Sequence, residues 1–257
     1  IRKNGEPTYF AADIAYHKNK FSRGFDLLID IWGADHHGYV ARMKAAAAAL
    51  GHEGKLDLVI GQLVNLFRDG EAVRMSKRTG EMVTFEELLA EVGADAARYW
   101  FLRRSTDQQV DFDIGVAKEQ SAENPVYYVQ YAHARICSIL RKAAGADTDD
   151  ESVDIASVAP AAAELSLLAE DSELALLRKL AELPEVVEIA AHELAPHKLT
   201  RYAEDLAATF HQFYTVCKVV QPEVPELTGA RLALVDATRI VLATTLGLLG
   251  VSAPERM

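Results

Sequence analysis

The sequence predicts an α/β part followed by an all-α part. Residues 25–33 and 56–67 are short apolar runs that indicate strands, and residues 39–51 between them have the pattern of a helix. Strand, helix and strand in this order are typical of a parallel sheet with a helical connection. From about residue 115 onward the apolar residues follow a helical period, which predicts a bundle of roughly 130–140 residues.

The elements of the α/β part follow one another closely. Residues 8–21 predict a helix before the first strand. Both apolar runs predict buried strands, although the second, 56–67, also fits a helical period. Gly51 is expected to end the connecting helix. The turn at Gly33 would lie at the carboxyl end of its strand, where parallel sheets bind ligands.

A connecting region leads into the all-α part. Thr84 and Glu87 have the spacing of a capping box, and Gly93 splits residues 84–104 into two short helices. The further expected segments are an extended stretch at 108–114, a helix at 117–144, an exposed loop at 145–154 and three or four helices from there onward.

The bulk composition is that of a soluble globular chain, with half of its 257 residues apolar and a quarter charged. No apolar run reaches the roughly 18 residues that span a bilayer. The two cysteines, Cys137 and Cys217, exclude a Cys-rich zinc module and suggest buried thiols in a reducing compartment. Because the chain opens at Ile1 without a signal-peptide pattern, we expect it to be a piece of something longer.

The negative charge is concentrated in one segment. Between Asp147 and Glu193 there are thirteen acidic residues against the bases Arg178 and Lys179, which equals the whole net charge of −11. This segment can face away from a polyanion, so the acidic balance does not exclude a nucleic-acid partner. A solvated helical face explains the acids better than a dedicated acidic function does.

A basic loop precedes the helix that Thr84 opens. It contains Arg74, Lys77 and Arg78 between glycines at positions 70 and 80. Cations on a flexible loop are suited to binding phosphates, whereas the alternative is an exposed charged turn.

Several stretches together resemble the class I aminoacyl-tRNA synthetases, and within them the arginyl-tRNA synthetase family. "RMSKR" (74–78) resembles the Lys-Met-Ser-Lys-Ser signature, and "GADAARYWFLRRS" (93–105) resembles the Asp-Ala-Leu-Arg element that names the family's anticodon-binding domain, with Ala97 in place of leucine. "NPVYYVQYAHARICSILRKA" (124–143) resembles the opening helix of that domain. "YFAADIAYH", "WGADHHGY" and "ERM" fit the same family.

Two features depart from the family pattern. Arg74 replaces the first lysine of the signature, which keeps the charge but not the compact ammonium group. None of the eight histidines forms the second signature, His-x-Gly-His. The resemblance therefore implies a C-terminal fragment that is inactive by itself. It would contain the C-terminal half of a Rossmann-like catalytic domain (1–66), a connecting region with the signature loop (67–114) and an all-α anticodon-binding domain (115–257).

The function that the resemblance implies is that of an arginine–tRNA ligase. The full enzyme would activate arginine with ATP and Mg²⁺ and esterify it to arginine tRNA, as a cytoplasmic monomer without a structural metal or a membrane partner. The alternative is a non-catalytic tRNA-binding protein derived from a synthetase. A sister enzyme for cysteine or methionine is disfavoured because those enzymes commonly use cysteine-rich zinc sites.

The resemblance also implies roles for residues of the catalytic part. Charge accumulates on phosphoryl oxygens during activation, so cations of the signature loop would lower the barrier. The catalytic residues would be Lys77, Arg74, Ser76 and Arg78, and the ATP-binding residues would be Gly33, Asp35, His37, Met75 and Lys77. A metal site at Asp35, His36 and His37 is disfavoured because adjacent histidines rarely point at one ion. Asp35 is also a candidate helix cap.

Arginine selection requires a group that binds a planar guanidinium, and a carboxylate does this in bidentate contact. Tyr9 and Asp13 lie four residues apart on one helix face, and they match the positions that hold the substrate side chain in arginyl enzymes. Without the resemblance, Asp13 would be a solvated helix residue.

Anticodon bases are usually bound by aromatic side chains on which they stack. Tyr127, Tyr128, Tyr131 and Arg135 fall on one predicted amphipathic helix, and Tyr214 and Lys218 are spaced four apart on another. The candidate tRNA-binding residues are Tyr127, Tyr131, Arg135, Tyr214, Lys218 and Met257. Packing in the core is the alternative for each tyrosine.

Overall fold

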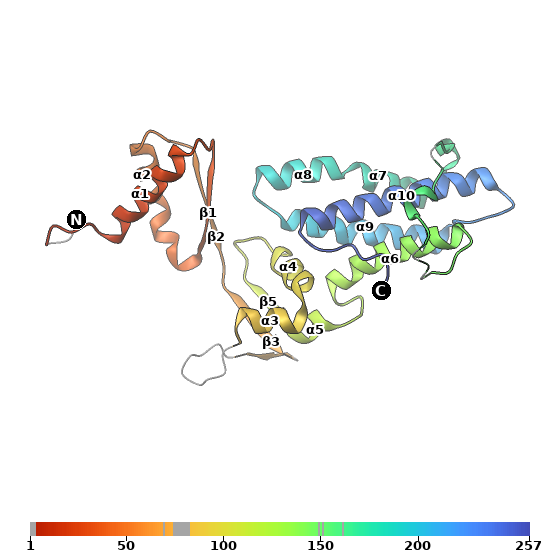
Figure 1. The fold of residues 1–257 in the computed structure, drawn as a ribbon, viewed down its shortest axis with the longest axis horizontal. Helices are drawn as coiled ribbons and strands as arrows, with labels where there is room; N and C mark the ends of the chain where they lie inside the picture. The colour runs from red at the N-terminus through yellow and green to blue at the C-terminus, as the bar shows by residue number, and fades with distance from the viewer. Residues whose placement is uncertain (1–3, 69, 74–82, 149, 151, 161) are drawn as a thin grey trace. The chain divides into compact units, whose positions relative to one another are not determined.

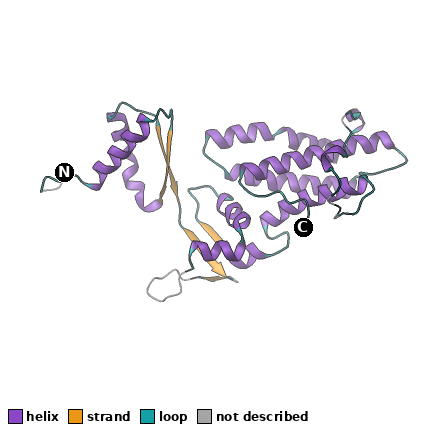
Figure 2. Ribbon diagram, viewed as in Figure 1, coloured by secondary structure: helices purple, strands orange, loops and turns teal. Residues whose placement is uncertain are grey.

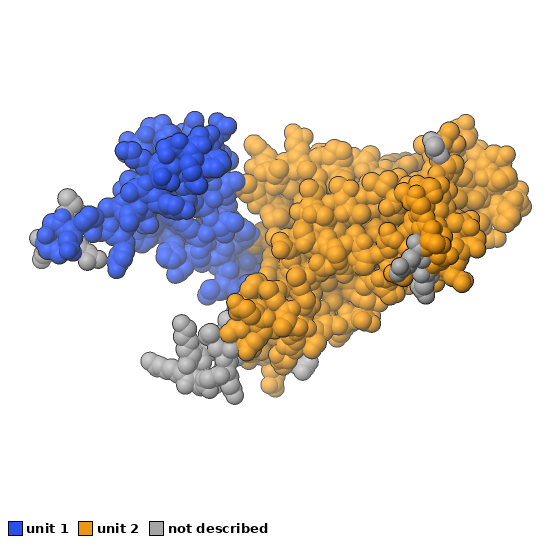
Figure 3. Space-filling model, viewed as in Figure 1, with its two compact units in different colours: residues 1–65, 106–110 blue, residues 66–105, 111–257 orange. Residues whose placement is uncertain are grey.

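The computed structural model describes residues 4–68, 70–73, 83–148, 150, 152–160 and 162–257 (Figure 1). These residues form two compact units, which Figure 3 shows in different colours. Unit 1 comprises residues 1–65 and 106–110, and unit 2 comprises residues 66–105 and 111–257.

Unit 1 is a β–α–β motif with one additional helix. Its elements are α1 (Tyr9–Ser22), β1 (Leu28–Gly33), the 3-10 helix η1 (Ala34–Tyr39), α2 (Val40–Ala49) and β2 (Leu56–Gly61). The strands pair in parallel along their whole length, from Leu28 opposite Leu56 to Gly33 opposite Gly61. This confirms the predicted parallel arrangement. Gly51 follows α2 with a φ of 86°, as expected of a residue that ends a helix.

One face of β1 is covered by the helices of unit 1. Leu28 and Asp30 are buried, whereas Ile29 and Ile31, which alternate with them along the strand, are 46% and 76% exposed. An apolar run without alternation is typical of a strand that is covered on both faces, and the sequence therefore predicted a fully buried strand. The exposure of Ile29 and Ile31 shows that this prediction is wrong within the described unit. The core beneath the covered face comprises Phe21, Leu28, Met43, Ala47 and Leu56.

The second apolar run forms two strands, so both the single strand and the helix expected at 56–67 are wrong. The run leaves the parallel sheet after Gly61, where Gln62 N donates a hydrogen bond to Thr106 O at 3.0 Å. The chain then forms β3 (Val64–Arg68), which lies between β4 (Glu71–Ala72) and β5 (Val110–Asp113) in a second sheet. β5 confirms the extended stretch predicted at 108–114.

The predicted capping box opens α3 (Phe85–Val92). Glu87 N donates to Thr84 Oγ1 at 3.1 Å, and Thr84 N donates to Glu87 Oε2 at 2.8 Å. Gly93, with a φ of 81°, separates α3 from α4 (Ala94–Leu102), which confirms the predicted split. The backbone direction changes there at low cost because glycine has no Cβ.

The remainder of unit 2 is a helical bundle (Figure 2). The helix expected at 117–144 is interrupted after α5 (Ile114–Lys118), because the Asn124 side chain bonds Ala117 O and Glu119 O and Pro125 opens a new helix. The bundle consists of α6 (Pro125–Ala143), α7 (Asp171–Ala181), α8 (Leu183–His192), α9 (His197–Val216) and α10 (Pro225–Leu248), with the short 3-10 helices η2 (Ile155–Ser157) and η3 (Leu165–Leu167). Within the described residues, no helix is both long enough and apolar enough to cross a bilayer.

Among the residues that the structure describes, the acidic segment is mostly a solvated face, and Glu173 differs. Glu182, Glu185 and Glu188 are exposed, as expected. Glu173 is fully buried, and its Oε1 accepts a hydrogen bond from Arg231 Nε at 2.6 Å, which joins α7 to α10. A buried carboxylate requires such a partner, and the sequence gives no local signal of it because the two residues are 58 positions apart.

Candidate substrate cavity and nucleic-acid interface

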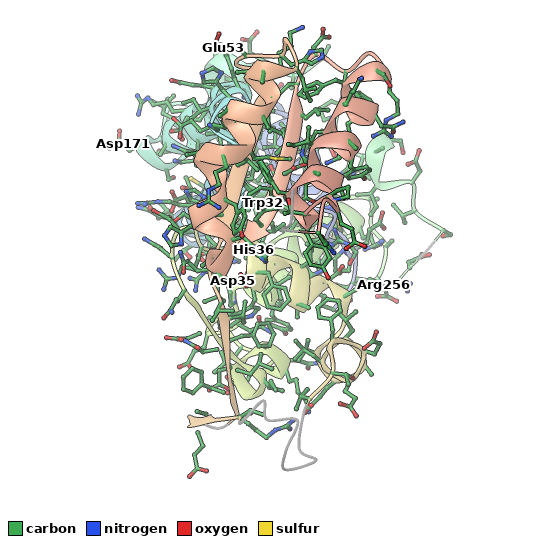
Figure 4. All side chains as sticks on the ribbon, turned by 90° about the vertical axis from the view of Figure 1, so that its left-hand side faces the viewer. Trp32, Asp35, His36, Glu53, Asp171 and Arg256 are labelled. Carbon is green, nitrogen blue, oxygen red and sulfur yellow. The ribbon has the colours of Figure 1, made fainter. Side chains whose placement is uncertain are left out.

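A cavity of about 1070 Å³ lies in unit 1 between α1, β1, η1 and the start of α2. Tyr9 and Asp13 line it from α1, one helical turn apart. Trp32 and His36 line it from β1 and η1, and their rings meet edge-on with centroids 6.4 Å apart (Figure 4). The cavity therefore combines an accessible carboxylate with aromatic walls, which is a suitable environment for a planar organic cation.

A buried ionic network underlies this cavity, and the sequence analysis missed it. Asp30 of β1 accepts hydrogen bonds from His17 Nε2 at 2.6 Å and from Lys20 Nζ at 2.7 Å, while His17 Nδ1 lies 2.8 Å from Asp13 O. Burial by itself would raise the pKa of Asp30, but the hydrogen bonds from Lys20 and His17 outweigh it and hold the pKa below its ordinary value. The network joins the helix that carries Asp13 to the strand behind it.

We expect the network to make unit 1 sensitive to acid. A carboxylate whose pKa is lower in the folded state stabilises the fold above its unfolded pKa, and this stability is lost as the pH falls through the folded pKa. Asp30→Asn should therefore lower the free energy of unfolding by about 1–3 kcal/mol at neutral pH. Urea unfolding followed by Trp32 fluorescence, with Trp100 replaced by phenylalanine, measures this value. If the variant keeps the steep loss of stability below pH 4, Asp30 is not its source.

The predicted ATP residues lie at the carboxyl end of β1. Gly33 ends the strand, and a Cβ at this position would stand 2.7 Å from Asp35 Oδ1. Asp35 is not a helix cap, because Gly33 occupies the N-cap position of η1. The Asp35 carboxylate instead lies beside His36, with 3.4 Å between Asp35 Oδ2 and His36 Nε2. His36 lines the cavity, whereas His37 contacts Ala34 O at 3.2 Å and is not among the lining residues. The ATP-binding roles of Gly33, Asp35 and His37 stay predictions.

No group of three His, Cys, Asp or Glu side chains that could hold a metal ion occurs among the residues that the structure describes.

The signature loop lies outside the described residues, and so do its predicted residues Arg74, Met75, Ser76, Lys77 and Arg78. The elements on either side of it are joined by ion pairs. Arg68 of β3 donates to both carboxylate oxygens of Glu91 at 2.7 and 2.9 Å, and Lys118 reaches the same carboxylate at 3.2 Å. The hydrogen bond from Arg68 is the main cause that lowers the pKa of Glu91 to about 2. The strand before the loop and the helix after it are thus held together.

Three predicted tRNA-binding residues lie along α6 in unit 2. Tyr127 and Tyr131 stack with ring centroids 6.1 Å apart and an interplanar angle of 12°. Arg135 Nη1 donates to the Tyr131 hydroxyl at 3.0 Å, and its guanidinium lies 4.9 Å from the centre of the Tyr214 ring of α9. The cation and the rings thus form one continuous half-exposed surface.

Two neighbouring cavities open on this surface. The α6–α9 cavity, of about 240 Å³, is lined by Tyr131, Arg135, Tyr214 and Met257, among others. The second cavity, of about 540 Å³, shares Tyr214 with the first and lies around the end of α9, where Lys218 lines it. The structure therefore brings the predicted tRNA-binding residues into one region of unit 2.

The sequence predicted that Lys218 lies on the same helix as Tyr214, but this prediction is wrong. α9 ends at Val216, and Cys217 has extended backbone angles, so the i, i+4 relation is lost. The sequence analysis also missed Lys142, which lines both cavities from the last turn of α6. Its position seven residues after Arg135 could have indicated this, because residues seven apart share a helix face.

Two other half-buried aromatic residues lie near this surface, and Tyr128 packs against the core, as Tyr214 also does. The Tyr128 ring lies 5.3 Å from the His211 ring, and burial is the main cause that raises the pKa of Tyr128. Burial first, and then the Arg135 charge, lower the pKa of His211. The half-exposed stack of Tyr127 and Tyr131 thus lies beside Tyr128 on α6, and the His211 ring of α9 contacts both Tyr128 and Tyr131.

Residues 129–257 match the family model of the DALR anticodon binding domain. The chain belongs to this family. The matched residues include α6 from Val129 onward, with Tyr131 and Arg135, and all of the helices α7 to α10, whereas Tyr127 lies just before the match. Both cavities, and the aromatic surface apart from Tyr127, are therefore features of an anticodon-binding domain.

Relatives extend the match over the whole chain. The arginine–tRNA ligase of Heliobacterium modesticaldum is 57% identical over all of it, and that of Moorella thermoacetica is also 57% identical. Two solved structures cover the full chain as well: one from Campylobacter jejuni, at 37% identity and a TM-score of 0.83, and Thermus thermophilus arginyl-tRNA synthetase, at 27% identity and a TM-score of 0.76.

The DALR domain and the residues before it thus correspond to the C-terminal part of arginyl-tRNA synthetases. The chain spans 45% of the length of the two curated relatives, and 54% and 50% of the two solved chains.

Proposed function

We propose that the protein containing this chain is an arginine–tRNA ligase, in which unit 1 contributes to the arginine and ATP sites and the DALR domain binds the anticodon loop. The observation that carries the proposal is the convergence of Tyr131, Arg135, Tyr214 and Met257 on one cavity of the DALR domain. Aromatic faces beside a fixed cation are the usual means of binding unstacked bases.

The cavity of unit 1 supports arginine as the amino acid. Asp13 presents its carboxylate to the cavity, and Tyr9 and Trp32 supply aromatic walls. A carboxylate accepts two parallel hydrogen bonds from a guanidinium, a geometry that a lysine ammonium does not reproduce. The His17–Asp30 contact would hold the helix of Asp13 in place for this recognition.

In the proposed activation step, the arginine carboxylate attacks the α-phosphate of ATP and pyrophosphate leaves. Lys77, with Arg74 and Arg78, would stabilise charge on the phosphoryl oxygens, while Ser76 and Met75 would contact the nucleotide. Gly33, Asp35 and His37 would contact the ATP ribose and the amino-acid end. Mg²⁺ would enter with the ATP phosphates, where it neutralises their charge.

Tyr214 provides a test of the RNA surface. If its ring stacks on a base, Tyr214→Ala should weaken binding of an arginine tRNA anticodon stem–loop by about 1–3 kcal/mol. Tyr214→Phe keeps the ring and its contact with Arg135, so it should bind nearly as well as the unchanged chain. Fluorescence anisotropy with a labelled stem–loop gives both values, and equal losses in the two variants would argue against stacking.

The ligase assignment is tested by charging. The complete protein, supplied with ATP, Mg²⁺ and total tRNA, should esterify arginine and no other standard amino acid to tRNA. Charging with a different amino acid would reject the arginine pocket, and tRNA binding without any charging would favour a non-catalytic tRNA-binding protein.

A further inference from the structure

The segment that follows α10, residues 251–257, contains neither helix nor strand, and its last residues form one wall of the α6–α9 cavity. We call it the tail segment. It begins after Gly250, which has a φ of 67° and lies so close to Arg98 that a Cβ would stand 3.1 Å from the guanidinium. A segment outside regular structure needs other partners for its backbone polar groups, and side chains of α4 and α6 supply them.

The first half of the tail segment is bound by Asp95, Gln130 and His133. Ser252 N donates to Asp95 Oδ2 at 3.2 Å, and the Ser252 hydroxyl bonds the same oxygen. Gln130 Nε2 donates to Ser252 O and to Asp95 Oδ2, each at 3.0 Å. His133 Nδ1 lies 2.9 Å from Pro254 O. Since a carbonyl oxygen can only accept, His133 Nδ1 donates this bond, and burial lowers the pKa of the ring.

Arg141 binds the second half of the tail segment. Its side chain is 2% exposed, and the guanidinium donates to Asp150 O at 3.1 Å, to Glu255 O at 3.1 Å and to Glu255 Oε2 at 2.5 Å. The Glu255 side chain is 53% exposed. A buried cation that contacts both the backbone and the side chain of one residue restrains that residue strongly.

α6 serves two purposes on adjacent faces. Gln130, His133 and Arg141 bind the tail segment. Tyr131 and Arg135 lie close to them in the sequence of α6, but they line the α6–α9 cavity. Residues 255–257 line the same cavity. The position of Met257 in the cavity therefore depends on the contacts of Glu255 two residues earlier.

We infer that Arg141 is a positioning residue for anticodon binding: it fixes Glu255 and so places Met257 against the base held by the α6–α9 cavity. This inference rests on the proposed function. Arg141 itself need not contact RNA, since its guanidinium is directed to Asp150 and Glu255.

The variant Glu255→Gln distinguishes the positioning role of Arg141 from a purely electrostatic effect of the Glu255 charge on RNA binding. Removing a negative charge beside a polyanion should strengthen RNA binding if charge alone matters. Positioning predicts the opposite, a loss of about five- to tenfold, because the amide replaces the charge-assisted bond to Arg141. The control is Glu226→Gln, which removes an exposed carboxylate at the start of α10. Tighter binding in Glu255→Gln than in the control would overturn the inference.

A second measurement does not involve RNA. With methionine methyl groups labelled with ¹³C, the Met257 signal, identified by its absence in Met257→Ala, should carry a ring-current shift in the unchanged chain. Arg141→Leu should move it to the position of a free methionine, while the signal of the core residue Met43 stays in place. A Met257 signal that Arg141→Leu leaves unmoved would reject the positioning role.

A double variant tests whether the two residues act through one another. Met257→Ala and Arg141→Leu should each weaken stem–loop binding about tenfold, and the double variant should be no more than about twofold weaker than either. Losses that multiply would reject the inference, because they would show independent effects. If the unchanged chain binds no stem–loop, the proposed function fails, and the methyl signal still decides whether Arg141 holds the tail segment.

Discussion

Lys77→Ala in the complete enzyme should slow arginine activation by two to three orders of magnitude, a loss of about 3–4 kcal/mol of transition-state stabilisation. The charge that Lys77 would neutralise develops on the phosphoryl oxygens during the reaction, so the variant should affect turnover far more than arginine binding. Arginine-dependent exchange of pyrophosphate into ATP measures the rate.

Lys77→Arg and Lys198→Ala are the matched variants for this experiment. The first keeps a cation of different geometry and should recover part of the rate. The second removes a partly exposed lysine of α9, which pairs with Glu193 at 3.0 Å, and should leave activation unchanged. Near-normal turnover in Lys77→Ala would mean that Lys77 does not stabilise the charge on the phosphoryl oxygens.

Asp13→Asn should raise the Kd for arginine by about two orders of magnitude, because it removes the charge opposite the guanidinium and keeps the side chain's size. The substitution leaves the Asp13 backbone carbonyl, which contacts His17, in place. The preference for arginine over citrulline, its uncharged counterpart, should collapse at the same time. Calorimetric titration of the complete enzyme with both amino acids gives these values.

Asp26→Asn is the control for this variant. Asp26 is an exposed acid of unit 1 that does not line the cavity, so its substitution should leave arginine binding unchanged. Unchanged arginine affinity in Asp13→Asn would mean that Asp13 is only a solvated helix residue.

Features with local causes could be predicted from the sequence. Thr84 and Glu87 cap α3 because the capping box needs only residues three apart. Gly93 divides α3 from α4 because glycine readily adopts a positive φ. Tyr127, Tyr131 and Arg135 share a surface because residues four apart meet on a helix.

Features that depend on distant partners could not be predicted. Ser252 and Asp95 are 157 positions apart, and Arg141 and Glu255 are 114 apart, so no pattern in the sequence indicates that they meet. The end of α9 before Lys218 was missed because neither glycine nor proline follows Val216 immediately. The role of Asp30 could not be predicted because it lies within an apolar strand and its partners, His17 and Lys20, lie on the preceding helix.

The most direct test of the account is the affinity of this chain for arginine tRNA, compared with the same tRNA carrying a replaced anticodon loop. We expect clear binding of the first, weakened by salt because phosphate contacts release counterions, and a loss of at least about tenfold with the second. Neutralising Asp149, Asp150 and Glu151 should barely change either affinity. Equal affinity for the two tRNAs would contradict the claim that the DALR domain of this chain reads the anticodon loop.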